Sequence, residues 1–188
     1  MDAIPGTVSS DRSRLSSSAI DPSTVAVRSI HTMANGGLTD FDEVIHPDAV
    51  DHENTVQPPA SRVCGPAGFH ATALWLRAAF ADLHYDIHHV IAGGDLVAVN
   101  SMMNGRHVAQ FVVYTEGAEV DTAFPPTGRT FAATQSHWFR IQDGKVIEHW
   151  ANRDELGQAK QLGWVPPTPL YLLKMARAKS HAKHAAQR

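Results

Sequence analysis

The chain has 188 residues, which as a prior corresponds to one domain with terminal extensions. Hydrophobic residues make up 43% of it and charged residues 19%, which excludes wholesale disorder, and a net charge of -3 without a basic, aromatic-rich stripe argues against nucleic-acid binding. The single cysteine, Cys64, excludes an intramolecular disulfide, and no apolar run reaches the roughly 18 residues of a membrane-spanning helix. We therefore expect a protein of the reducing cytoplasm that does not enter membranes.

The N-terminal part predicts a disordered arm followed by helices. Residues 1–20 have few large apolar side chains and no sustained periodicity, so they cannot offset the entropy of ordering. Asp21 and Pro22 predict the start of a helix that ends near residues 35–37. A second, short helix is predicted from Thr39, whose side chain would cap it.

The middle of the chain changes from a helical to a strand-like pattern. Gly65 and Pro66 open a segment whose apolar residues recur every three or four positions as far as Phe80, which predicts a third helix. Short β-prone runs follow at residues 85–92, 96–100, 107–114, 130–141 and 145–152. Helices followed by an antiparallel meander predict an α+β fold with helices on one face of a curved sheet.

The C-terminal part predicts one short helix and an extension. Residues 155–162 can form helical turns that end at Gly163, and Asp154 is either the cap of this helix or an acid of a site. Residues 166–188 end in a Lys/Arg/His/Ala-rich tail that either docks as a helix or stays mobile. The folded domain is expected to span residues 21–165.

The hairpin that turns at residues 143–144 decides which side chains share a face. A two-residue loop would bury the Glu148 carboxylate against apolar residues, whereas a three-residue loop with a bulge pairs His137 with His149. We prefer the second register because it keeps the apolar residues together. It places on one face Gln135, His137, Phe139, Ile147, His149 and Ala151, and on the other face Trp138, Arg140, Glu148 and Trp150.

Two facing histidines beside an apolar wall are candidates for chemistry. His137 and His149 could act as general acid and base near neutral pH, or could hold a metal together with His52. The structural alternative is a pair of hydrogen-bonded core histidines. His107 is a further candidate at a pocket mouth, and nothing in the sequence places Asp51, in loop-like surroundings, near the pair.

Several short motifs follow one another over about residues 22–163. They are Asp48-Ala-Val-Asp-His52, Gly65-Pro-Ala-Gly68, Gly105-Arg-His107, Pro126-Thr-Gly-Arg129, Trp138-Phe-Arg140, and the run from Asp143-Gly-Lys-Val-Ile-Glu-His-Trp150 to Asp154-Glu-Leu-Gly157. In order and spacing this set resembles the SnoaL-like polyketide cyclase (ester cyclase) branch of the nuclear transport factor 2-like superfamily.

The resemblance implies a cone-shaped fold, in which a bent antiparallel sheet wraps around the N-terminal helices and leaves a deep apolar pocket. It implies an intramolecular aldol condensation of a bulky, carbonyl-containing polyketide by a His and an Asp, without a metal or organic cofactor. His137 resembles the family's histidine, but Ala151 stands where the family's Glu-His-Trp-Asp pattern has its Asp. Either His149 takes over the role of that Asp, or the pocket binds a ligand without catalysis.

The same resemblance suggests the partners. The expected ligand is a small molecule, contacted by side chains of His52, His107, Gln135, Phe139, Ala151 and Phe80. Domains of this family are often dimeric through the sheet, and the rings of Trp138 and Trp150 on the outer face suit such a homodimer contact.

Overall fold

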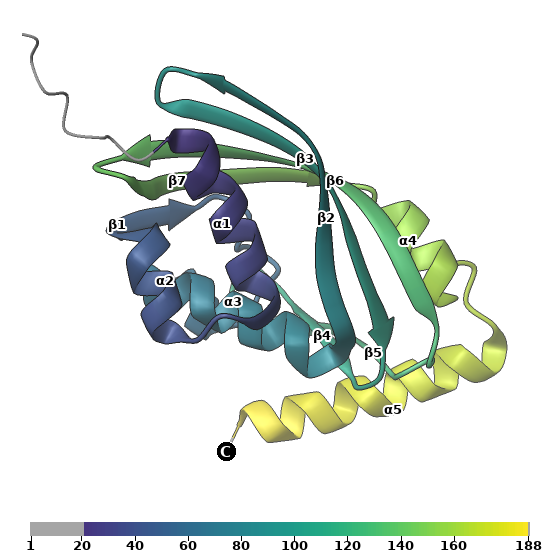
Figure 1. Cartoon of the computed structure of the whole chain (residues 1–188). Helices are drawn as coiled ribbons and strands as arrows, with labels where there is room; N and C mark the ends of the chain where they lie inside the picture. Colours follow the sequence, from purple (N-terminus) through teal and green to yellow (C-terminus); the bar gives the residue numbers. More distant parts are fainter. Residues whose placement is uncertain (1–20, 188) are drawn as a thin grey trace, which may run out of the picture.

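Within residues 21–187, which the structure describes, N-terminal helices pack on one face of a curved five-stranded sheet (Figure 1). The structure is a computed structural model, and the arm predicted at residues 1–20 lies outside the described residues. The helices on this face are α1 (Pro22–Asn35), α2 (Leu38–Val44) and α3 (Pro66–Ala79), and a short 3-10 helix η1 (Pro59–Arg62) precedes α3. This α+β arrangement confirms the predicted fold class.

The starts of the first two helices show which local signals operate. Asp21 caps α1, its carboxylate accepting a hydrogen bond from the Ser23 backbone N–H at 3.2 Å. The predicted cap of α2 is wrong, because the helix begins at Leu38 and Thr39 already lies inside its first turn. Gly37 is the N-cap residue instead, and its backbone N–H donates to the Asp40 carboxylate at 2.8 Å.

The main sheet has the strand order β1-β7-β6-β3-β2, in which β1 runs parallel to β7 and the other neighbours are antiparallel. A separate two-stranded ribbon of β4 and β5 stands beside it. The strands are β1 (Ile45–Asp51), β2 (Phe80–Gly93), β3 (Leu96–His107), β4 (Phe111–Tyr114), β5 (Val120–Phe124), β6 (Thr130–Gln142) and β7 (Lys145–Arg153).

Three strand predictions need correction. β3 continues without a break to His107, because small or flexible residues such as Ser101 and Met103 alternate toward the core and keep the period of two. The predicted run 107–114 is therefore divided between β3 and β4. β1 and β5 were not predicted as strands, and β1 gains its ladder only by pairing with β7, about 100 residues away in the chain.

The β6–β7 hairpin has a register that differs from those predicted for a two-residue loop and for a three-residue loop with a bulge. Asp143 and Gly144 both have positive φ, 51° and 74°, and form a two-residue turn. One extra residue, Ile147, then shifts the ladder, so that Phe139 pairs with His149 and His137 with Ala151. The predicted pairing of His137 with His149 is wrong, but it differs from the observed pairing by two residues, so both histidines still face the core side.

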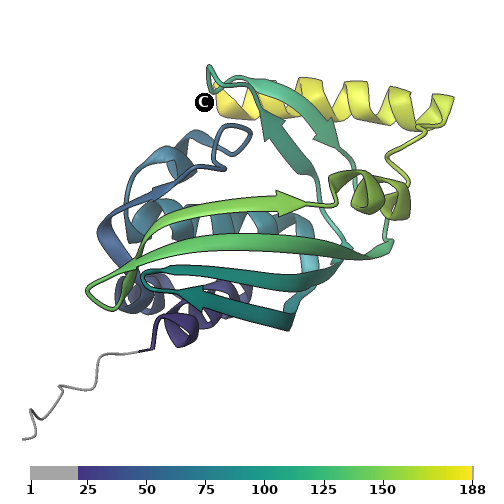
Figure 2. The same ribbon diagram turned by 90° about the horizontal axis from the view of Figure 1, so that it is seen from above.

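The C-terminal part is helical. α4 (Glu155–Leu162) is capped by Asp154, which accepts from the Gly157 N–H at 2.8 Å, and Gly163 ends it at a φ of 73°. α5 (Pro169–Ala186) lies along the β4–β5 ribbon (Figure 2). The Tyr171 hydroxyl donates to the Pro125 carbonyl at 3.0 Å and fastens α5 there. No helix within residues 21–187 is long and apolar enough to cross a membrane.

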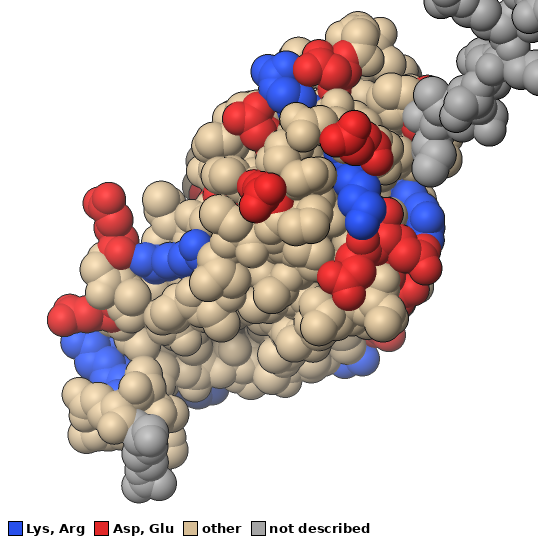
Figure 3. All heavy atoms as spheres, turned by 90° about the vertical axis from the view of Figure 1, so that its left-hand side faces the viewer, with Lys and Arg blue, Asp and Glu red and all other residues tan. Residues whose placement is uncertain are grey.

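The core lies between the helices and the sheet and includes the fully buried Phe41, Ile45, Val97 and Val146. The outer surface at the α1–α2 end carries Lys and Arg side chains beside Asp and Glu, without a continuous basic area (Figure 3). One such pair joins Arg28 of α1 to Glu43 of α2. Charges of both signs are therefore interspersed on this face.

Candidate active site

An apolar cavity of about 370 Å³ lies between the helices, the sheet and the β4–β5 ribbon. Each layer contributes to its wall, and most of the lining side chains are aliphatic or aromatic, which suits a bulky apolar ligand. The apolar lining residues are Ile30, Met33, Val56, Phe69, Trp75, Leu76, Phe80, Met103, Phe111, Val113, Phe124, Phe139, Ala159 and Trp164.

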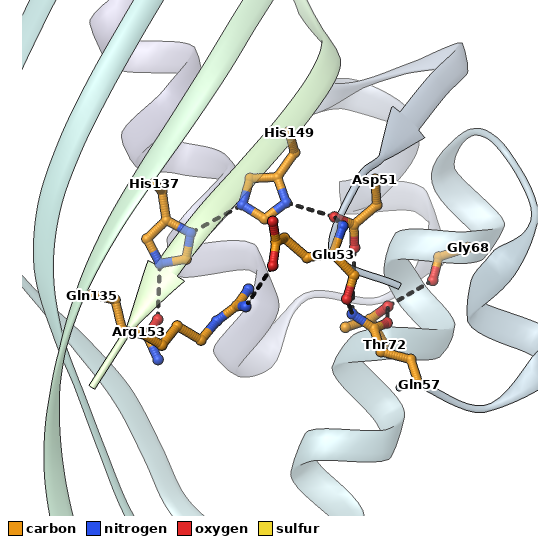
Figure 4. A network of polar contacts seen from close by, with 9 residues as sticks. All are labelled: Asp51, Glu53, Gln57, Gly68, Thr72, Gln135, His137, His149 and Arg153. Carbon is orange, nitrogen blue, oxygen red and sulfur yellow. Dashed lines mark hydrogen bonds and ion pairs between the residues drawn. The ribbon is translucent and has the colours of Figure 1, made fainter. Parts of the chain in front are cut away.

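One wall of the cavity carries a chain of buried polar side chains (Figure 4). His149 Nδ1 lies 2.9 Å from Asp51 Oδ1, and His149 Nε2 lies 3.0 Å from His137 Nδ1. His137 Nε2 in turn lies 2.8 Å from Gln135 Oε1. All four residues are at most 9% exposed, so a continuous hydrogen-bonded path runs through protein and ends at the cavity.

Asp51 reaches this chain because β1 pairs in parallel with β7. The pairing places Asp51 opposite His149, and the next residue, His52, donates its backbone N–H to the His149 carbonyl at 3.0 Å. The loop that follows β1 holds the Asp51 carboxylate as well, because the Glu53 N–H donates to it at 3.1 Å. Asp51 was not predicted as a residue of the site. The alternation of Ile45, Ala49 and Asp51 toward the core is the signal that could have indicated a strand here.

Burial and neighbouring charges set the ionisation of the chain. Burial by itself raises the pKa of Asp51, but the hydrogen bond and the charge of His149 outweigh it and hold that pKa below the usual 3.8, so Asp51 is a carboxylate at neutral pH. Burial, together with the positive charges of His149 and Arg153, lowers the pKa of His137 well below the usual 6.5. His137 is therefore uncharged at neutral pH and has a lone pair to offer.

Two proton arrangements satisfy the same set of contacts. In the first, His149 carries protons on both nitrogens, and it donates to Asp51 and to His137 Nδ1, while His137 Nε2–H donates to Gln135. The second arrangement has one proton fewer. His137 then donates from Nδ1 to His149, and its unprotonated Nε2 accepts a hydrogen bond from the Gln135 amide group, which is turned by 180°. The chain can therefore take up a proton at His137 Nε2 and move positive charge to His149, beside Asp51.

The mouth of the cavity carries the remaining charged groups. Arg153 Nη1 lies 3.5 Å from Glu53 Oε2, and both side chains line the cavity (Figure 4). Glu155 and Gln158 of α4 also line the cavity. With one arginine facing several carboxylates, the lining favours an uncharged ligand over an anionic one.

The structure brings most of the sequence-predicted site residues together. Gln135, His137, Phe139, His149 and Phe80 all line the cavity. Ala151 is buried beside it, directly across the strand pair from His137.

Two predicted ligand contacts lie elsewhere. His52 is on the outer side of the sheet, where it stacks on Trp150 at a ring distance of 4.7 Å and lies 3.6 Å from the Glu148 carboxylate. The side chain of His107 is fully buried behind the cavity wall, between the rings of Phe80 and Trp164. Residue 52 points outward because it follows Asp51, which points inward, and neighbouring strand residues alternate faces. The metal alternative also fails, since it needed His52 beside the pair.

The chain is similar to known proteins over most of its length. A family model described as SnoaL-like polyketide cyclase matches residues 24–162. Aklanonic acid methyl ester cyclase DnrD of Streptomyces peucetius is 32% identical over 148 residues, which are 76% of this chain and 90% of the relative. Nogalonic acid methyl ester cyclase of Streptomyces nogalater is 32% identical over 129 residues, 68% of this chain and 87% of the relative. The crystal structure of wild-type IdmH from Streptomyces antibioticus is 27% identical, with a TM-score of 0.59, and the match covers 76% of this chain and 99% of IdmH.

Proposed function

Since the chain belongs to the SnoaL-like polyketide cyclase family, we propose that it closes a ring in a polyketide ester by an intramolecular aldol condensation. The observation that carries the proposal is the buried path from Asp51 through His149 to His137, which ends at an apolar cavity. A positioned base that is neutral at physiological pH is what removal of a proton beside a carbonyl group requires.

The reaction begins with proton removal at His137. A carbon flanked by carbonyl groups gives its proton to His137 Nε2, while the Nδ1 proton of His137 passes to His149 Nε2. Positive charge then lies on His149, where the Asp51 carboxylate stabilises it at 2.9 Å. The Gln135 amide, released from His137, donates to the oxygen of the enolate that has formed.

Ring closure completes the cycle without a net change in protons. The enolate carbon attacks a second carbonyl carbon of the same molecule, a carbon–carbon bond forms, and the carbonyl oxygen becomes an alkoxide. The proton stored on the chain returns through His137 Nε2 to this alkoxide, which gives the alcohol. Substrate and product have the same composition, so no oxidant or reductant is consumed.

This path supplies the carboxylate that strand β7 lacks at position 151. In the family pattern the Asp follows His-Trp, but position 151 is Ala here and carries no acid. Asp51 of β1 approaches from the opposite side of His149 and is joined to His137 through that ring. His149 and Asp51 together take the part of the missing Asp.

The test is conversion of an ester substrate in heavy water. Aklanonic acid methyl ester, the compound named for the relative, is incubated with the wild-type protein and followed by liquid chromatography and mass spectrometry. We expect deuterium uptake at the acidic carbon of recovered substrate and a new product of unchanged composition. Binding without deuterium uptake would overturn the proposal in favour of a non-catalytic ligand-binding module. Absence of both would show that the ester class is wrong.

We also propose that the protein is a homodimer through the outer face of the sheet. Trp138 is 42% exposed there and pairs across the strands with Trp150. A large aromatic side chain of this kind is typical of an interface centre. Sedimentation should give twice the chain mass for the wild type and the chain mass for Trp138→Glu; a wild-type monomer at micromolar concentration would contradict the proposal.

The proposed location is the cytoplasm. Cys64 is the single cysteine of the chain, and its thiol is free and exposed. Such a thiol persists in a reducing compartment. Fractionation of the producing cells should recover the protein in the cytosolic fraction, and its recovery from the culture medium would refute this location.

A further inference from the structure

Three neutral donors of the cavity wall are engaged by the protein itself. Among the neutral donors, the Ser29 hydroxyl donates to the Ala26 carbonyl at 2.8 Å, and the Thr72 hydroxyl bonds to Gln57. The Trp75 indole N–H donates to the Val112 carbonyl at 2.8 Å. None of these groups is free to bind a ligand.

Tyr85 differs from these donors. It lies on β2 opposite Met103, lines the cavity and is 7% exposed. Its hydroxyl makes no hydrogen bond to any residue of the described range 21–187. In that range, the polar side-chain atoms that are fully enclosed by protein and have no hydrogen-bond partner belong to Ser61, Ser101, His107 and Trp164. The Tyr85 hydroxyl is not one of them, so it is not fully enclosed. An unpartnered hydroxyl on a cavity-lining side chain that is not sealed opens to the cavity.

The Tyr85 hydroxyl keeps its proton at neutral pH. Burial raises its pKa to about 12, although the charges of Arg153 and Arg77 act in the opposite direction. It is therefore a hydrogen-bond donor and not a base. An ordered donor that faces an apolar cavity without a protein partner is costly to the free protein, and a ligand oxygen can satisfy it.

We propose that the Tyr85 hydroxyl donates to the carbonyl oxygen that is attacked during ring closure. The inference rests on the proposed function and adds the group that acts on the electrophile. As the new carbon–carbon bond forms, negative charge develops on that oxygen and the hydrogen bond from Tyr85 Oη strengthens. The alkoxide is then neutralised by the proton that His137 took from the substrate, so Tyr85 ends the cycle unchanged.

The position of Tyr85 in the sheet assigns it to the attacked carbonyl and not to the enolate. Gln135 is in contact with His137 and can serve the enolate oxygen, which is bonded to the carbon next to the one that loses its proton. Tyr85 lies on β2, two strands from β6, which carries His137. Through β3, Tyr85 is level with Ala133, which lies four residues along β6 from His137. With strands about 4.8 Å apart and a rise of about 3.3 Å per residue, the two backbone positions are separated by roughly 16 Å. Both side chains line the same cavity, so a substrate lying between them can hold its acidic carbon at His137 and turn the oxygen of the adjoining, attacked carbonyl toward Tyr85.

The test separates the two half-reactions with Tyr85→Phe and uses Tyr114→Phe as the matched control. Tyr114 belongs to the β4–β5 ribbon and is not among the cavity-lining residues. Tyr85→Phe is expected to lower kcat for ring closure about 10²-fold, the usual effect of losing one donor to a developing oxyanion. Deuterium uptake at the acidic carbon should stay within about twofold of wild type, because the base is intact. Tyr114→Phe should leave both unchanged.

Two outcomes would overturn this role. Ring closure by Tyr85→Phe at the wild-type rate would show that the hydroxyl does not act, and an equal loss of deuterium uptake would assign Tyr85 to the enolate or to the fold. Failure of the proposed function is distinguishable, because the wild type would then show neither half-reaction.

A second readout does not depend on turnover. With carbonyl-labelled 9-fluorenone, an aromatic ketone without an acidic carbon, the bound carbonyl stretching band should lie at lower wavenumber in wild type and Tyr114→Phe than in Tyr85→Phe. Equal bands in all three proteins would show that Tyr85 does not donate to a bound ketone.

Discussion

Replacing His137 with Gln is expected to lower kcat for ring closure by about 10²- to 10⁴-fold, the range for loss of a positioned general base. Deuterium uptake at the acidic carbon should fall in the same proportion, because both steps need the proton transfer at His137 Nε2. Gln fills a similar space and keeps a hydrogen-bonding group beside His149, so substrate affinity should change little. Rates of deuterium uptake and of product formation, with Kd from fluorescence titration, measure the effect.

The matched control for this substitution is His52→Gln. His52 lies on the outer side of the sheet, stacked on Trp150, and is not among the cavity-lining residues. It should therefore keep wild-type deuterium uptake and ring closure. If His137→Gln behaved like His52→Gln, His137 would be a structural residue of the core and the proposed base would be wrong. Thermal unfolding of both variants checks that a loss of activity is not a loss of fold.

Asp51→Asn is expected to lower kcat about 10²- to 10⁴-fold although it leaves the cavity intact. The amide oxygen can still accept from His149 Nδ1, so the ring keeps its position, but the charge that stabilises protonated His149 is lost. The chain then takes up a proton less readily. The acid limb of the pH–rate profile should therefore lie at lower pH in the variant than in the wild type. The measurement is kcat against pH for both proteins.

A rescue experiment separates loss of charge from loss of structure. Ala151 lies opposite His137 in the strand pair, at the position where the family pattern has Asp. Adding Ala151→Asp to Asp51→Asn returns a carboxylate to the chain from the other side. We expect the double variant to recover part of the lost kcat and to move the acid limb back toward higher pH, since a carboxylate near His137 raises its pKa. A double variant no better than Asp51→Asn would show that Asp51 acts through the fold.

Local signals in the sequence predicted the elements that depend on neighbouring residues. Asp21 with Pro22 marks the start of α1, Gly163 marks the end of α4, and the spacing of apolar residues defines α3. The inward-facing set of the hairpin, including His137 and His149, was also predictable, because a strand alternates its faces with a period of two. An error of two residues in register left both histidines on that face, but the predicted inward position of Ile147 is wrong, because Ile147 is the extra residue of the bulge and Val146 is buried instead.

The sequence by itself determined that His137 and His149 share the inner face of a curved sheet, and it showed that Ala151 removes the expected acid. Only the tertiary structure decided which carboxylate joins them. Asp51 comes from a strand whose parallel partner is about 100 residues away, and no local pattern encodes such a pairing. The same holds for Tyr85, whose free hydroxyl becomes evident only when the neighbouring donors of Ser29 and Trp75 have been assigned their partners. Proton chemistry in this fold depends on contacts between distant strands, which form because burial of the apolar faces brings those strands together.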